Sequence, residues 1–305
     1  MTRTNVVVLT NERDFAADLV IHELGRHPVE VTRCNIESAC KSAVRAWRPN
    51  NAERGGPDVV WWRQFEADHS PASLGDADEQ LVDKAQWRSW LATLYAPDAV
   101  WMNDLWAGRR AENKIEQLRV AARVGFTVPR SVVTNDRATA SRFRDEVGST
   151  VVKTLAAAYY SLSDQSFVFT ELLDDDLVER TDLWGEVPII VQENLGDALD
   201  ARVVSFGENT FAAQCMSKGV DWRKTPFDAT SWSVWAVPDS VATACREYRS
   251  VLGLEYAAFD FMIDGRTVYF LEANQAGEWM FLERALNMPI GAALADHLAD
   301  MAARS

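Results

Sequence analysis

The stretch Phe259-Asp-Phe-Met-Ile-Asp-Gly-Arg-Thr-Val-Tyr-Phe-Leu-Glu-Ala-Asn274 carries the most information about the fold of this chain. It predicts a strand, a tight turn at Asp264-Gly265, and a second strand that ends in the oxygen-bearing side chains of Glu272 and Asn274. Residues two apart on a strand point to the same side. Glu272 and Asn274 are therefore expected to share a face.

The register of this hairpin decides whether Asp260 joins them. A two-residue loop of Asp264 and Gly265 places Asp260 on the face opposite Glu272. A three-residue loop, Ile263 to Gly265, with Gly265 left-handed in a bulge, places Asp260 on the same face as Glu272. Since glycine is the residue that such a bulge favours, we expect a positive φ at Gly265, or an equivalent bulge that supplies the same shift, and the three oxygen-bearing side chains on one face.

Clustered carboxylate and amide oxygens suit Mg²⁺ held against phosphates better than zinc or a soft metal. We therefore predict that Asp260, Glu272 and Asn274 are metal ligands. The alternative is a surface hairpin whose acidic residues bind nothing.

Composition sets the outer limits. A chain of 305 residues can form two or three lobes, and 25% charged with 48% hydrophobic residues is typical of a globular enzyme. The net charge of −14 argues against a nucleic-acid partner. The four cysteines lack CxxC spacing, and no membrane span or signal peptide is evident, so we expect reduced thiols, no membrane association and a cytoplasmic location.

The first hundred residues alternate between strand and helix patterns. We expect strands at Asn5–Leu9, Val29–Arg33 and Asp58–Arg63, and a helix from Asp14 to Gly25. This alternation predicts a small parallel sheet covered by helices. Arg63 ends a strand, where such sheets bind ligands, although a solvated structural arginine is the simpler interpretation.

Two lysines stand out in the middle of the chain. Lys114 lies at the start of a helix expected over residues 112–124, and Lys153 ends the strand Thr150–Lys153. Between them we expect a strand at Ser131–Thr134 and a helix that Asn135 caps. A lysine ammonium is a suitable partner for phosphate oxygens, although each lysine could also be merely solvated.

Further polar residues follow in order along the chain. Gln192 begins the polar end of a strand, and Arg202 lies in the first strand of an antiparallel pair, 201–206 with 210–214. Arg223 follows in a loop. Either arginine could make two parallel hydrogen bonds to a phosphate.

Several motifs together resemble the microviridin-type graspetide synthetases, which are ATP-grasp maturases of ribosomal peptides. The resemblance spans the whole chain. The motifs are Ala111-Glu-Asn-Lys114, Gly125-Phe-Thr-Val-Pro129, Val133-Thr-Asn-Asp136, Asp221-Trp-Arg223 and Phe270-Leu-Glu-Ala-Asn-Gln-Ala-Gly-Glu-Trp279.

The resemblance implies an α/β protein with the ATP-grasp fold. It implies an N-terminal pre-ATP-grasp α/β domain over residues 1–105, a central lobe over 106–189, and a C-terminal lobe with the metal site over 190–305. ATP would lie between the last two lobes. The segment 154–163, which follows the second lysine, contains no glycine, whereas many ATP-grasp proteins cover phosphates with a glycine-rich loop there.

The resemblance also implies roles for individual residues. Lys114 and Lys153 would contact phosphates of ATP, and Mg²⁺ would bind the three ligands predicted above. Arg223 and Arg202 would be catalytic and steady the γ-phosphate. The segment beside adenine would comprise Gln192, Glu193, Asn194 and Leu195.

The implied activity is ATP-dependent closure of ester or amide macrocycles in a precursor peptide that has a leader and a core. We also expect a homodimer, and we predict that the segment Phe167–Asp182 contacts the leader through its acidic part. The alternatives are an ATP-grasp ligase that joins separate molecules and a peptide-binding module without catalytic activity.

Overall fold

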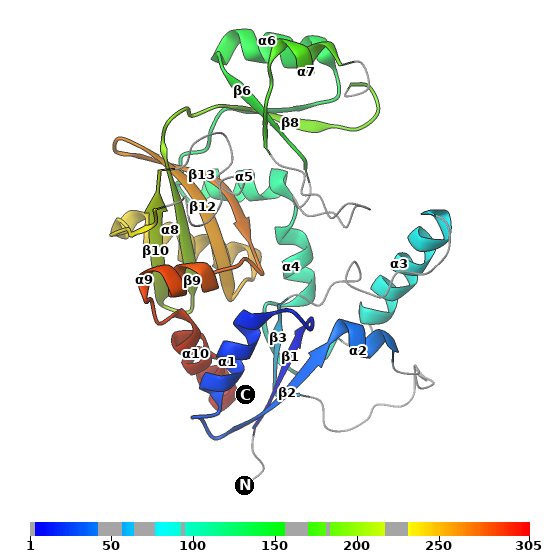
Figure 1. The fold of residues 1–305 in the computed structure, drawn as a ribbon, viewed down its shortest axis with the longest axis vertical. Helices are drawn as coiled ribbons and strands as arrows, with labels where there is room; N and C mark the ends of the chain where they lie inside the picture. Colours follow the sequence, from blue (N-terminus) through cyan, green and yellow to red (C-terminus); the bar gives the residue numbers. More distant parts are fainter. Residues whose placement is uncertain are drawn as a thin grey trace. The chain divides into compact units, whose positions relative to one another are not determined.

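The computed structural model describes residues 4–41, 57–63, 77–92, 95–155, 170–180, 184–216 and 231–305. The chain forms two compact units (Figure 1). The first consists of Met1–Gly108, Gly253–Tyr256 and Gln275–Ser305, and the second of Arg109–Leu252 and Ala257–Asn274. The division into three lobes at residues 105 and 189 stays a prediction.

The first unit contains a parallel four-stranded sheet in the order β2-β1-β3-β4, as the alternation of strand and helix patterns predicts. Its strands are β1 (Thr4–Thr10), β2 (Val29–Asn35), β3 (Val59–Trp62) and β4 (Val100–Met102). The helices are α1 (Phe15–Leu24), α2 (Ile36–Lys41), α3 (Ala77–Ala92), α4 (Leu105–Ala111), α9 (Met280–Leu286) and α10 (Ile290–Arg304), of which α4 continues into the second unit.

Strand β3, with the sequence Val-Val-Trp-Trp, is buried along its whole length, as expected for a parallel sheet covered on both faces. The helices α1 and α10 lie side by side against this sheet (Figure 1). Gly291 permits their close approach, because a Cβ atom there would lie 3.0 Å from the side chain of Leu19. The C-terminal helix is thus part of the core of the first unit.

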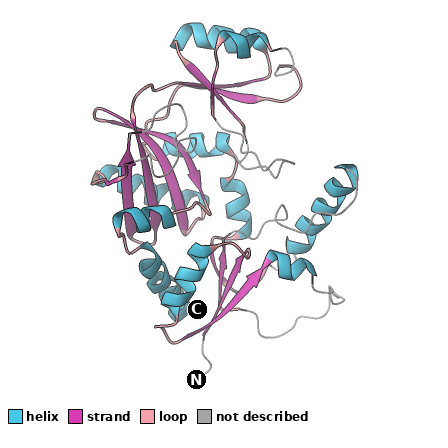
Figure 2. Ribbon diagram, viewed as in Figure 1, coloured by secondary structure: helices cyan, strands magenta, loops and turns pink. Residues whose placement is uncertain are grey.

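The second unit contains two sheets (Figure 2). The four-stranded sheet has the order β5-β8-β6-β7, with strands β5 (Ser131–Thr134), β6 (Thr150–Lys153), β7 (Glu171–Leu172) and β8 (Ile189–Glu193). The five-stranded sheet has the order β11-β10-β9-β12-β13, with strands β9 (Leu199–Phe206), β10 (Asn209–Cys215), β11 (Ser233–Val234), β12 (Tyr256–Asp264) and β13 (Thr267–Asn274). The helices are α5 (Lys114–Arg123), α6 (Arg137–Val147), α7 (Asp175–Glu179) and α8 (Asp239–Leu252).

Local side-chain chemistry explains where α6 begins. The carboxylate of Asp136 accepts a hydrogen bond of 2.8 Å from the backbone N–H of Thr139, so Asp136 is the N-cap. The prediction that Asn135 caps this helix was wrong. The Asn135 side chain instead donates to the Gly185 carbonyl oxygen.

Cys34, Cys215 and Cys245 are free thiols, as expected. Burial raises the pKa of both Cys215 and Cys245 to about 12. Among the described residues, no helix is long and apolar enough to cross a membrane.

Candidate functional site

The hairpin of β12 and β13 brings two predicted metal ligands opposite each other. Asp260 pairs with Glu272 in the strand register, and Ala258 pairs with Asn274. The predicted common face of Asp260, Glu272 and Asn274 is therefore confirmed.

The irregularity of the hairpin that places Asp260 on this face differs from the expected loop. Asp264 pairs with Thr267, so the loop consists of Gly265 and Arg266, and the predicted three-residue loop was wrong. Gly265 does have the expected positive φ, 58°. The register shifts by one residue at a bulge beside Asp260, away from the turn, and this shift returns the acid to the face of its partner.

The opposite face of the hairpin is aromatic. The rings that pack there include Phe126, Tyr248, Phe259, Phe261 and Phe270. The ring centroids of Phe126 and Phe261 are 5.2 Å apart, and those of Tyr248 and Phe259 are 5.3 Å apart. Because side chains alternate along β12, this packing fixes Asp260 on the polar face.

Cationic side chains pair with both acids of the polar face. Arg202 on β9 donates from Nη1 to both carboxylate oxygens of Asp260, at 2.7 and 2.8 Å, and both residues are buried. Lys114, the first residue of α5, places Nζ 3.1 Å from Oε2 of Glu272. The polar face thus carries two carboxylates, each of which is paired with one cationic side chain.

The chemistry of this donor set fits Mg²⁺. Asp260, Glu272 and Asn274 all offer hard oxygen atoms from one face, the ligands that Mg²⁺ prefers. Within the described ranges, no three His, Cys, Asp or Glu side chains gather into a group that could hold a metal ion; the polar face combines two such acids with the amide of Asn274. The polar face of the hairpin is therefore the candidate site for the ion.

Lys153 and Gln192 form a second group, on the four-stranded sheet of the same unit. Lys153 Nζ donates to Oε1 of Gln192 at 2.7 Å, and Gln192 Nε2 donates to the Ser131 hydroxyl at 3.0 Å. Beyond them Asn194 donates from its backbone to the Ser149 carbonyl oxygen at 2.9 Å. The Lys153 side chain thus reaches Gln192, while the chain after Gln192 leaves the end of β8 beside the start of β6, where Thr150 pairs with Glu193.

Some predicted features lie outside the described residues. They are Arg223 with the Asp-Trp-Arg motif, most of the glycine-free segment 154–163, and residues 167–169 and 181–182 of the predicted leader-binding segment. The roles predicted for these residues stay predictions.

Asn103 was missed from the sequence. It is buried in the first unit and makes four hydrogen bonds of 2.6–2.8 Å, accepting from the backbone N–H groups of Glu255 and Tyr256 and donating to the carbonyl oxygens of Tyr256 and Gln275. It thereby joins the start of β12 to the residue that follows β13. An asparagine after a short strand gives no sign of such distant partners.

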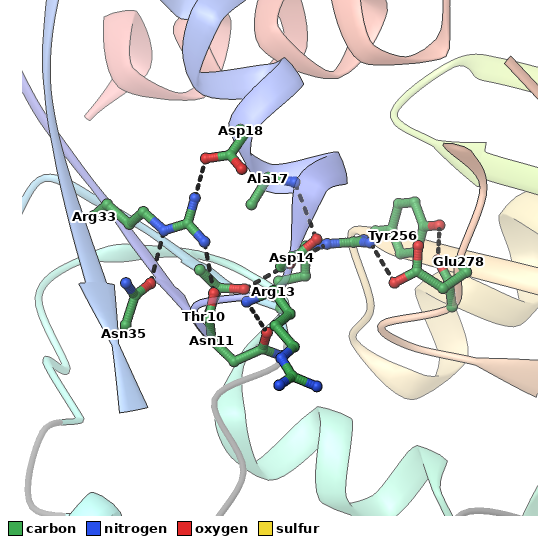
Figure 3. Close-up of polar contacts among 12 residues, drawn as sticks. Thr10, Asn11, Arg13, Asp14, Ala17, Asp18, Arg33, Asn35, Tyr256 and Glu278 are labelled. Atoms are coloured by element: carbon green, nitrogen blue, oxygen red, sulfur yellow. Dashed lines mark hydrogen bonds and ion pairs between the residues drawn. The ribbon is translucent and has the colours of Figure 1, made fainter. Parts of the chain in front are cut away.

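Arg63 is buried, and the interpretation of it as a solvated arginine was wrong. Its side chain is 1% exposed, and it donates to Asp14 at 2.6 Å and to Glu278 at 2.8 Å (Figure 3 labels both carboxylate partners). The rings of Trp61 and Trp279 lie 5.6 and 5.9 Å from the guanidinium carbon. Burial acts to lower the pKa of Arg63, but Glu278, Asp14 and Tyr256 together raise it above its ordinary value. The arginine is therefore a charged core residue of the first unit.

Comparison with known proteins gives no match to a protein-family model and no match among curated sequences. Solved structures do match, over nearly the whole of both chains. Macrocyclase MdnC from Microcystis aeruginosa MRC, bound with precursor peptide MdnA, has a TM-score of 0.83 at 22% identity and covers 97% of this chain and 100% of its own. Macrocyclase MdnB from the same organism has a TM-score of 0.79 at 27% identity, with coverage of 97% and 99%.

A third structure carries both a nucleotide and a peptide. The RiPP-associated ATP-grasp ligase of Chryseobacterium gregarium, in complex with ADP and a leader and core peptide, has a TM-score of 0.82 at 23% identity and covers 97% of each chain. The resemblance inferred from the sequence motifs is thus confirmed, and the chain has the ATP-grasp fold of the RiPP-associated macrocyclases.

Proposed function

We propose that this chain is an ATP-dependent ligase that closes ester or amide macrocycles in a ribosomal precursor peptide. The observation that carries this proposal is the polar face of the β12–β13 hairpin. There, Asp260 and Glu272 lie opposite each other, with Arg202 and Lys114 as their partners. Similarity to macrocyclases over nearly the whole chain supports the same activity.

The proposed reaction has two steps. An Asp or Glu side chain of the peptide takes the γ-phosphoryl group of ATP, which gives an acyl-phosphate and ADP. A Ser or Thr hydroxyl or a Lys amine of the same peptide then attacks the acyl carbon and releases phosphate. ATP and Mg²⁺ would supply the phosphoryl group and neutralise its charge.

The residues of the polar face have distinct parts in this proposal. Asp260, Glu272 and Asn274 would hold the cation. In the nucleotide-bound protein, Lys114 and Arg202 would exchange their carboxylates for phosphate oxygens, which carry like charge and accept the same hydrogen bonds. Arg202 would then steady the transferred group, with Arg223 as its proposed companion.

The nucleotide would extend toward the second group of polar residues. Lys153 would contact phosphate oxygens, and Gln192, Glu193, Asn194 and Leu195 would border the adenine. The precursor peptide is the proposed partner, and a homodimer stays an untested expectation.

Mass spectrometry tests the proposal. The protein is incubated with ATP, Mg²⁺ and a short peptide, encoded beside its gene, that contains Thr and Asp or Glu residues. We expect release of ADP and loss of one water from the peptide for each bond formed. When the product is fragmented in the mass spectrometer, the closed ring should give no fragments from within it. EDTA should stop both the release of ADP and the loss of water. Attachment of a separate amine with a gain in mass would favour the intermolecular ligase, and failure to use ATP would favour the binding module.

The next prediction concerns the binding of the leader segment of the precursor peptide. Asp174, Asp175 and Asp176 are exposed at the start of α7, and Asp174 caps this helix by accepting from Leu177 N–H at 2.8 Å. Reversing all three charges would also remove the cap, so the sharper variant is Asp175→Lys with Asp176→Lys. We expect KM for a leader-bearing peptide to rise about 10-fold, the effect of 1.4 kcal/mol, with KM for ATP unchanged.

A matched control makes the same change in net charge on α6. Asp145→Lys with Glu146→Lys reverses two exposed acids there and should leave both KM values unchanged. If the α7 variant matches this control, the acids of α7 only stabilise the helix terminus and the leader binds elsewhere.

A further inference from the structure

Strand β13 is the outer strand of its sheet, and outer strands leave backbone groups without a neighbouring strand. In this protein, parts of two other segments meet those groups. The Thr127 carbonyl oxygen accepts a hydrogen bond of 2.8 Å from the N–H of Phe270. Further along the edge, the side chain of Gln117 on α5 meets Ala273, which lies between Glu272 and Asn274.

The amide of Gln117 binds both backbone groups of Ala273. Its Nε2 donates to the Ala273 carbonyl oxygen at 2.8 Å, and its Oε1 accepts from the Ala273 N–H at 3.1 Å. The same Nε2 donates to the Ala111 carbonyl oxygen at 2.7 Å. Gln117 is buried, so these bonds are shielded from water and would be costly to leave unmade. The side chain thus takes the place of a peptide group in a sixth strand.

Lys114 and Gln117 are three residues apart and therefore share a face of α5. Lys114 pairs with the side chain of Glu272, and Gln117 holds the backbone of the next residue. Asn113 fixes the start of this helix by accepting from the N–H groups of Ile115 and Glu116. One capped helix face therefore constrains two consecutive residues of β13.

We propose that Gln117 is a positioning residue that orients Glu272 and Asn274 for the divalent cation and so sets the affinity for that cation. This inference rests on the proposed function. The backbone torsions of Ala273 set the directions of the side chains on either side of it, so a clamp on its N–H and C=O acts on both. Glutamate keeps the acceptor for the Ala273 N–H but loses both donated bonds, whereas leucine loses all three bonds, so the two variants separate the two sides of the clamp.

The test measures the clamp and the cation separately. Amide hydrogen exchange at Ala273 in the ligand-free protein reports the clamp, and Mn²⁺ titrated in the presence of ADP, followed by EPR, reports cation binding. In Gln117→Leu we expect faster exchange at Ala273 and Mn²⁺ affinity lowered about 10- to 100-fold, the scale seen when residues behind a metal ligand are changed. Gln117→Glu should lower Mn²⁺ affinity while the carboxylate still accepts from the Ala273 N–H and keeps its exchange slow, and circular dichroism checks the folding of both variants.

Arg119→Gln is the matched control, since Arg119 is exposed on the same helix, and it should change neither quantity. The positioning role is overturned if Mn²⁺ affinity of Gln117→Leu stays at the wild-type value while its exchange at Ala273 accelerates, or if that exchange does not accelerate. Both outcomes leave the proposed function standing. A wild-type protein that binds no Mn²⁺ with ADP would instead overturn the proposed function.

Discussion

Glu272→Gln is expected to lower ATP-dependent peptide modification by at least about 100-fold. A metal ion stabilises transition-state charge by several kcal/mol, and each 1.4 kcal/mol corresponds to a factor of ten in rate. Glutamine keeps the shape of the side chain and one oxygen but removes the negative charge. Turnover measured as ADP release with the precursor peptide, at several Mg²⁺ concentrations, checks the result.

The choice of substitution follows from the pairing of Glu272 with Lys114. Lys114 has an 11% exposed side chain, so Glu272→Ala would remove the oxygen that this mostly buried ammonium contacts and would confuse loss of folding with loss of activity, whereas glutamine keeps an amide oxygen there. Asn274 is exposed, so Asn274→Ala should lose activity without loss of stability. Asp264→Asn, at the exposed turn of the same hairpin, is the control. If Glu272→Gln keeps the turnover of that control, Glu272 is not a metal ligand.

The largest loss of stability is expected for Arg63→Leu, about 3–5 kcal/mol in the free energy of unfolding. This arginine and its partner Asp14 each have side chains that are 1% exposed, so the change leaves a buried carboxylate without its cation. It also removes a cation that lies over the rings of Trp61 and Trp279. Urea unfolding followed by tryptophan fluorescence measures the loss.

Arg26→Leu provides the comparison for Arg63. Arg26 pairs with Glu23 in the same unit, but its side chain is 69% exposed, so water screens that pair. Its removal should change stability far less. Equal losses in the two variants would show that the Arg63–Asp14 pair contributes no more than a surface pair.

The bounds of an element could be predicted from the sequence where neighbouring residues determine them. Strands β5 and β6 have the predicted bounds, since Pro129 precedes one and Gly148, with φ of 88°, precedes the other. The common face of the three oxygen-bearing side chains was also predicted, because any odd register shift in the hairpin produces it. The bulge itself lies away from the turn, in a stretch where no glycine or proline signals it.

Distant contacts could not be predicted in this way. The partners of Arg63 lie 49 and 215 residues away along the chain, so nothing near it in the sequence distinguishes burial from exposure. Gln117 was missed for the same reason, because its partner Ala273 is 156 residues away. Helix α8 was not predicted, although its buried positions follow helical spacing. One of these buried positions is the charged residue Arg249, which donates a hydrogen bond to Ser205 on β9.

The path of the chain between the two units limits how such a protein can be recombined. The hairpin Ala257–Asn274 belongs to the second unit, yet Gly253–Tyr256 before it and Gln275–Ser305 after it belong to the first. A fragment of residues 109–252 would lack β12 and β13, and with them every proposed metal ligand. In a chimera with a single crossover after residue 108, the C-terminal helices would come from the second parent together with the hairpin. The first unit would then contain segments from both parents. Exchange of the second unit between related enzymes therefore requires four crossovers, after residues 108, 252, 256 and 274, which keep Arg109–Leu252 together with Ala257–Asn274.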